Sequence, residues 1–166
     1  MRDGKLIFGT NLDPEALVAN TPKFLGDVID TSGDTFYKSL AGTYTKDQNR
    51  ELGTGNPIYV VVGIGAVFSP VANKTIQFHL GHDETLAAGN LAAFTALASS
   101  PVLTAADVVA GDIISFDIPS GVELQRYIQI AVESSVNAGN ESGRFSSWIE
   151  LFNRSNKFYS EGQVWA

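Results

Sequence analysis

The chain has 166 residues, of which 44% are hydrophobic and 17% charged, and its formal net charge is −7. This length suits one domain with a core of its own, and the composition excludes a disordered polymer. The few basic residues are scattered, which argues against nucleic acid as a partner, and the absence of cysteine excludes disulfides, thiol catalysis and cysteine zinc sites.

The N-terminal stretch shows no targeting signal. Only three apolar residues follow Lys5 before Gly9, which is too short for the apolar region of a signal peptide. No window approaches the ~20 apolar residues that a membrane helix needs. We therefore expect a protein made in the cytoplasm, with no membrane partner.

Residues 1–25 predict an N-terminal arm or a short strand and turn. A strand is expected over residues 5–8, and Asp13 followed by Pro14 permits one helical turn. Val28 and Ile29 predict a brief strand that ends in a turn at residues 30–34. The polar residues 35–50 indicate a surface loop or a loosely paired hairpin.

A tight turn and a buried strand come next. Gly53 and Gly55 accept positive φ, and Pro57 fixes φ, so these three residues form a predicted structural turn. The β-branched and aromatic run Ile58–Val62 indicates a strand that is covered on both faces or lies in the middle of a tightly packed sandwich. The two glycines at 63 and 65 predict a bulge or twist in it.

The second half has the alternating apolar pattern of half-buried antiparallel strands. It appears at residues 74–80, 112–118, 124–132 and 145–152, with turns between them. A further strand is expected near residues 94–97, and Thr104 resembles a cap. With no βαβ alternation, the sequence predicts an all-β, single-domain protein, a jelly-roll β-sandwich over residues 26–153 with a C-terminal tail at 154–166.

The only histidines, His79 and His82, stand in a strand end and the turn after it. Asp83 or Glu84 would be needed to complete a metal site. No third histidine exists, so a solvated polar strand end is the favoured interpretation, and no metal or cofactor is expected.

Two other patterns resemble catalytic sites only weakly. The sequence at residues 30–33 differs from the loop of aspartic proteases by the inserted Ser32, and Asx-turn chemistry explains it more simply. Several carboxylates lie on or near predicted strands and would serve a glycosidase only as a facing pair. We interpret them as solvated residues and expect no catalytic residues; they are Asp112, Asp117, Glu123, Glu133 and Glu150.

Two features suggest structural roles. Arg126 stands in an otherwise apolar strand and needs carboxylate or carbonyl partners, so we favour an internal structural brace over a contact with a neighbouring subunit. The tail keeps Phe158, Tyr159, Val164 and Trp165, which an exposed tail rarely does. Docking on its own sandwich and an arm onto a neighbour or a capsid remain equally open.

Several blocks together resemble the capsid cement (decoration) proteins of tailed phages, of the Bordetella phage cement protein type. The turn of glycines and proline that enters the apolar strand is the most specific of them. Residues 34–48 and the tail after Asn153 extend beyond that pattern. The blocks are Gly26–Asp30, Arg50–Val62, Ala110–Asp112, Ile118–Pro119, Gln125–Ile130 and Gly143 with the final strand.

The resemblance implies a jelly roll that sits on the capsid exterior of the virion. It also implies a homo-oligomer, a dimer or trimer, that clamps neighbouring major capsid protein subunits and has no enzymatic activity. The alternative is a carbohydrate-binding jelly-roll module, with Tyr127, Trp148 and Phe152 as a candidate aromatic platform. A small enzyme, either a glycosidase or a metal-dependent one, is the third hypothesis.

Overall fold

A computed structural model of the chain describes residues 7–13, 17–31, 58–66, 75–104, 107–119, 125–135 and 143–150. Within these ranges the regular secondary structure is β-strand, without an α-helix. Across the same ranges, no helix is long and apolar enough to cross a membrane. The predicted all-β class is therefore confirmed.

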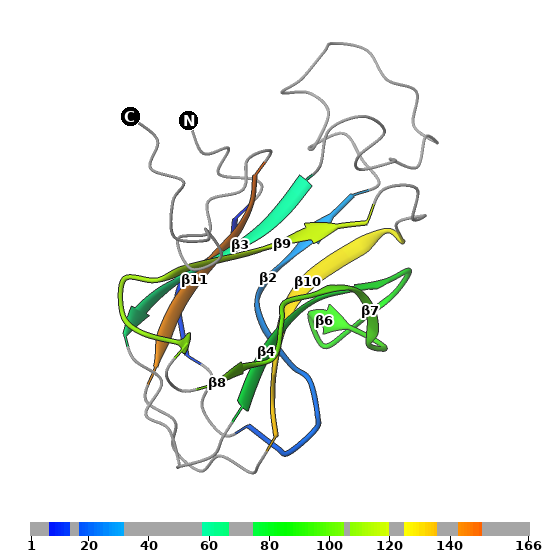
Figure 1. Cartoon of the computed structure of the whole chain (residues 1–166). Coiled ribbons are helices and arrows are strands. Elements are labelled where there is room, and N and C mark those ends of the chain that lie inside the picture. The colour runs from blue at the N-terminus through cyan, green and yellow to red at the C-terminus, as the bar shows by residue number, and fades with distance from the viewer. Residues whose placement is uncertain are drawn as a thin grey trace.

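The strands form two antiparallel sheets that face each other, together with a small hairpin (Figure 1). In spatial order, the first sheet contains β1 (Ile7–Leu12), β11 (Arg144–Glu150), β3 (Ile58–Ala66) and β9 (Ile113–Ile118). The second contains β2 (Lys23–Asp30), β10 (Tyr127–Ser134), β4 (Thr75–Asp83) and β7 (Thr95–Ser99), and β8 (Leu103–Thr104) also pairs with β4. The hairpin is β5 (Leu86–Ala87) with β6 (Asn90–Leu91).

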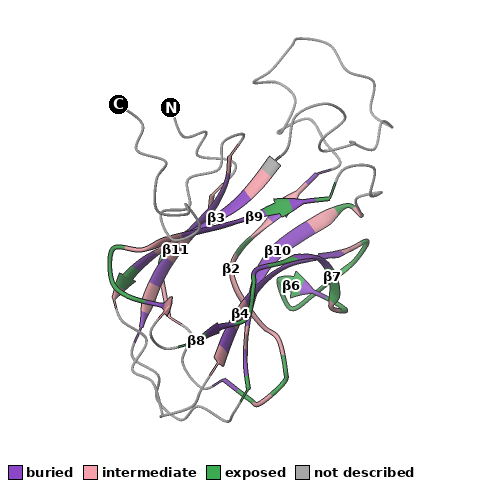
Figure 2. Ribbon diagram, in the orientation of Figure 1, coloured by how far each residue is buried: buried purple, intermediate pink, exposed green. Residues whose placement is uncertain are grey.

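The core lies between the two sheets. Alternate residues of the strands point inward, so the alternating patterns predicted from the sequence are confirmed for β4, β9, β10 and β11. Phe78 of the second sheet meets Phe145 of the first edge-to-face, with ring centroids 5.3 Å apart. Figure 2 shows buried residues running along β3, β10 and β4, and the molecule is a β-sandwich.

The predicted double coverage of β3 is also confirmed. Val60 and Val62 belong to the core between the sheets, and Val61, which points to the other face, is fully buried as well. Trp148 pairs with Val61 across the sheet and is 5% exposed. A strand buried on both faces does not alternate, which explains its unbroken apolar sequence.

β3 has a bulge at Gly65, one of the two glycines for which the sequence predicted a bulge or twist. Arg144 pairs with Ala66 and Phe145 pairs with Ile64, so Gly65 has no partner on β11. One extra residue on β3 locally bends the strand.

The N-terminal residues are part of the sandwich. β1 includes Asn11 and Leu12 and pairs with β11, and its register shifts between Gly9 and Leu12, where Asn11 has φ +56°. Part of the predicted helical turn, residues 14–16, lies outside the described ranges. Gly26 of β2 has φ +74°, and a Cβ there would lie 2.4 Å from the carbonyl oxygen of Phe8. β1 and β2 belong to different sheets. The absence of a side chain at Gly26 allows their backbones to approach closely.

Candidate functional site

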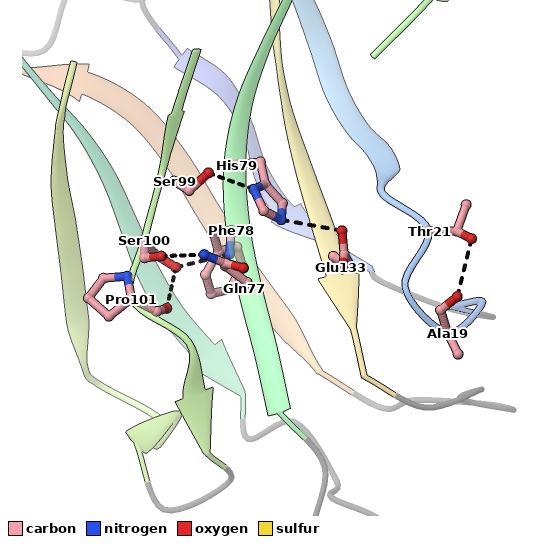
Figure 3. Close-up of polar contacts among 9 residues, drawn as sticks. All are labelled: Ala19, Thr21, Gln77, Phe78, His79, Ser99, Ser100, Pro101 and Glu133. Atoms are coloured by element: carbon pink, nitrogen blue, oxygen red, sulfur yellow. Dashed lines mark hydrogen bonds and ion pairs between the residues drawn. The ribbon is translucent and has the colours of Figure 1, made fainter. Parts of the chain in front are cut away.

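The outer face of the second sheet carries a polar contact network across three neighbouring strands (Figure 3). Ser99 of β7 stands directly opposite His79 of β4, and its Oγ lies 2.8 Å from His79 Nδ1. Glu133 of β10 stands diagonally across, with Oε2 3.7 Å from His79 Nε2. His79 is 7% exposed, so an exposed serine and a half-buried carboxylate flank a buried imidazole.

Burial keeps this imidazole neutral near pH 7. It lowers the pKa of His79 below the ordinary 6.5, and the nearby Glu133 carboxylate opposes that lowering. Among the described residues, Nε2 makes no hydrogen bond. The simplest tautomer has Nε2–H facing Glu133 and Nδ1 accepting the Ser99 hydroxyl hydrogen.

A serine, a histidine and a carboxylate are also the components of a hydrolase triad. Here the Glu133 oxygen lies beyond hydrogen-bond distance of the imidazole. The amide N–H of Ser100, next to the serine, already donates to the Phe78 carbonyl oxygen at 2.8 Å. The site therefore lacks the free pair of donors that an oxyanion needs within the ranges described above, and we do not propose catalysis.

The corner that follows β7 is held by the side chains of Gln77 and Ser100 (Figure 3). Ser100 Oγ accepts the Phe78 amide hydrogen at 3.0 Å and donates to the Pro101 carbonyl oxygen at 2.8 Å. The amide of Gln77 donates to the Ser100 carbonyl oxygen at 2.8 Å. These bonds satisfy the backbone where the chain leaves β7 and hold that end of the strand in place.

The hairpin β5–β6 covers part of this outer face. Gln129, which is fully buried, accepts the Leu91 amide hydrogen at 3.2 Å. Its own amide donates to Asn90 Oδ1 at 2.8 Å and to the Gly26 carbonyl oxygen at 2.9 Å. One side chain of β10 therefore ties the hairpin to β2.

Two further contacts hold the base of the hairpin. Asp83 Oδ2 accepts the Ala93 amide hydrogen at 2.5 Å, and this bond is the main cause of the lowered pKa of Asp83. Phe94 lies edge-to-face on His79, and a Cβ on Gly81 would lie 3.1 Å from its ring. The sequence patterns did not predict this hairpin or the role of Gln129. The only local signal was the sequence Ala88–Gly89, whose positive φ angles of 50° and 82° form the turn.

The two histidines do not converge. Their side chains point to opposite faces of β4, because His82 is three residues along an uninterrupted strand. Burial lowers the pKa of His82, against the charges of Asp83 and Glu84, and its Nδ1 accepts the Gln125 amide hydrogen at 3.3 Å. Within the described ranges, no three metal-ligating side chains gather at one point.

Arg126 lies just before β10 and is exposed rather than inward-facing. Its guanidinium forms an ion pair with Asp30 of β2, with Nη2 to Oδ2 at 3.0 Å, and lies 4.8 Å from the centre of the Tyr127 ring. The hydrogen bonds that Arg126 donates to Asp30 raise the pKa of Arg126. The partner is thus within the same chain, although an exposed ion pair adds little to stability.

The end of β2 accounts for the first two residues of the pattern that resembles a protease loop. Asp30 is the partner of Arg126, and the Thr31 hydroxyl donates to the Arg126 carbonyl oxygen at 2.8 Å. Both residues join β2 to the start of β10. Ser32 and Gly33 lie outside the described ranges.

The other candidate residues are far apart or lie outside the described ranges. Tyr127 is on the second sheet and Trp148 on the first, where it is buried, so the two share no platform. Glu133 is on the second sheet, whereas Asp112, Asp117 and Glu150 are on or beside strands of the first. The predictions that lie outside the described ranges concern Gly53, Gly55, Pro57, Glu123, Phe152, Phe158, Tyr159, Val164 and Trp165.

No protein-family model matches the chain, and no curated protein matches it either.

Proposed function

We propose that this chain is a structural virion protein that binds the outside of a tailed-phage head and clamps neighbouring major capsid subunits. The observation that carries the proposal is the resemblance of its sequence blocks to capsid cement proteins. Two of those blocks form strands in the interior of the sheets, β3 in the first and β10 in the second.

The order of the strands supports the jelly roll that this resemblance implies. Without the two-residue strands β5, β6 and β8, eight strands remain. The chain passes from one sheet to the other at every connection between them except that from β4 to β7. Two four-stranded sheets filled in this alternating way are expected of a jelly roll with two Greek keys.

A cement role also suits the physical character of the molecule. Such a protein needs a rigid body and surfaces for partners, and weak contacts of each copy add up when several copies are linked. The core is continuous between the sheets, and side-chain hydrogen bonds of His79 and Gln129 hold β7 and the hairpin to the second sheet.

The test uses heads of the encoding phage assembled without this protein. We expect the purified chain to bind them in a fixed ratio to the major capsid subunits and to raise their melting temperature. Heads that already carry the protein are the control and should bind no more of it. Absence of binding to the bare heads would contradict the proposal.

A further inference from the structure

One of the two longest uncharged stretches of this acidic chain, residues 85–106, has many of its described residues on the surface; the other is residues 52–73. Residues 85–106 contain no charged residue, although 17% of the whole chain is charged. Leu86 and Val102 are 41% and 60% exposed, and the alanines at 87, 88, 92, 93 and 96 are exposed as well. Figure 2 shows the exposed hairpin beside β7. Solubility alone favours charge on such a surface, so its absence requires another explanation.

This stretch includes an edge strand. β7 pairs with β4 along one side only, and its other side has no strand partner among the described residues. The Ser100 amide donates to Phe78 of β4, and amide directions alternate along a strand. The amide and carbonyl of Ser99 therefore point away from β4, toward the open side.

The open edge has few of the features that normally block pairing with another chain. Natural edges carry lysines, prolines, inward charges or bulges. β7, with the sequence Thr-Ala-Leu-Ala-Ser, has no charge and no proline, and its only irregularity is one shift in its register with β4. Its end is held by Ser100, and its outer-face residue Ser99 by His79. The end of β7 is therefore held in place, and apart from this shift in register the five-residue strand lacks those blocking features.

From these observations we infer that β7 is a docking edge for an extended, uncharged segment of a different polypeptide, which adds to the second sheet as a further strand. Main-chain hydrogen bonds to β7 supply the affinity of such pairing, and small side chains on the edge leave room for those of the partner. If the proposed function holds, this segment belongs to a capsid subunit, but the docking edge itself does not depend on that function.

The charges around the edge exclude a second copy as the favoured occupant. Asp83 and Glu84 precede the uncharged stretch and Asp107 follows it, and each chain carries a net charge of −7. Two copies paired through β7 would bring these like charges together, which opposes association. A different chain with an uncharged strand meets no such repulsion.

The test selects binders from a library of random peptides of about ten residues, enough to span a strand. The key variant is Thr95→Lys, which places a long charged side chain on β7. The matched control is Thr10→Lys, an exposed threonine on β1 at the edge of the other sheet. Ala96→Lys is a second β7 variant in case the first does not fold.

We expect selected peptides to be uncharged, to lose about tenfold or more in affinity for Thr95→Lys, and to bind Thr10→Lys as they bind the original chain. Hydrogen exchange should show bound peptide protecting the amides of residues 95–99. Failure to obtain any binder, or binders that ignore the β7 charge, would overturn the inference. A dimer of the free chain that Thr95→Lys dissociates would also overturn it, by showing a second copy as the occupant.

The same two variants, added to bare heads, separate this inference from the proposed function. If the original chain fails to bind the heads while the peptides behave as expected, the capsid role fails and the docking edge stands. If all three proteins bind the heads equally and the peptides ignore β7, the docking edge fails and the capsid role stands.

Discussion

At the scale of the residue, Gly26 occupies the most crowded backbone position among the described glycines. Its φ of +74° disfavours any side chain, and a Cβ would lie 2.4 Å from the Phe8 carbonyl oxygen. Backbone cannot move aside as a flexible side chain can. The close contact between β1 and β2, which belong to different sheets, therefore depends on Gly26 having no Cβ.

We expect Gly26→Ala to lower the free energy of unfolding by roughly 2–4 kcal/mol, because backbone strain and overpacking add. Gly89→Ala is the matched control, since Gly89 has a similar φ of +82° but nothing within 4 Å of its Cβ position. That variant should cost only about 1 kcal/mol. Urea denaturation measures both, and equal losses would show that the contact with Phe8 is unimportant.

The two buried histidines make stability depend on pH. Both have a folded-state pKa below 6.5, so the unfolded chain binds their protons at a higher pH than the folded chain does. Their contribution is complete above pH 6.5 and is lost as the pH falls toward the folded-state values.

The double variant His79→Gln, His82→Gln should therefore show a smaller fall in the free energy of unfolding between pH 7 and pH 5 than the original chain. Urea titrations at several pH values would measure it. The control is Asn20→Gly, at an exposed residue that does not titrate. It should leave the dependence of the free energy of unfolding on pH unchanged. An unaltered slope in the double variant would mean that other groups cause the dependence.

At the scale of the element, the β5–β6 hairpin depends on a strand that is far from it in the sequence. Each strand of the hairpin is two residues long, too short to be stable in isolation. Gln129 of β10 supplies three hydrogen bonds to Leu91, Asn90 and Gly26. The hairpin is therefore held by contacts from the sheet beneath it.

Gln129→Leu should cost about 2–4 kcal/mol, because it removes the partners of the buried Leu91 amide and of the half-buried Gly26 carbonyl. Hydrogen exchange at residues 90 and 91 should accelerate more than exchange in β3. Asn90→Ala removes one partner that is exposed, and we expect it to cost less than about 1 kcal/mol. A Gln129→Leu protein with the original exchange pattern would contradict the anchoring role.

At the scale of the whole molecule, the two sheets share one core and should unfold together. Phe78 and Phe145 join them directly. Phe78→Ala and Phe145→Ala should each cost about 3–5 kcal/mol, and a double-mutant cycle should give a coupling of about 0.5–1.5 kcal/mol.

Phe24→Ala is the comparison for this cycle, because Phe24 packs on Phe94 at the outer face, with ring centroids 5.8 Å apart. It should affect exchange in the hairpin and leave both sheets protected. Thermal unfolding followed by circular dichroism and hydrogen exchange would report these effects. Separate transitions for the two sheets would show that the core is not shared.

The limits of prediction from this sequence have clear causes. The strands with inward Ile76, Ile114 and Phe145 could be found because an alternating pattern reports a local fact, one apolar face turned to the core. The partners of Gln129 could not be predicted, since nothing near residue 129 indicates that residues 90 and 91 return to cover it. Arg126 was expected inside its strand, but it lies one residue before β10 begins at Tyr127, where its side chain is exposed.

Local patterns were enough to predict the all-β class, the strands β3, β4, β9, β10 and β11, and a bulge or twist near Gly63 and Gly65, because each follows from local periodicity or from the conformational freedom of glycine. Only the tertiary structure decided that β7 lies at an edge, that its Ser99 meets His79, and that the hairpin covers Gln129. Those relations join residues 20 to 39 positions apart, and pairing at such a distance depends on how the sheets assemble, which local patterns do not specify.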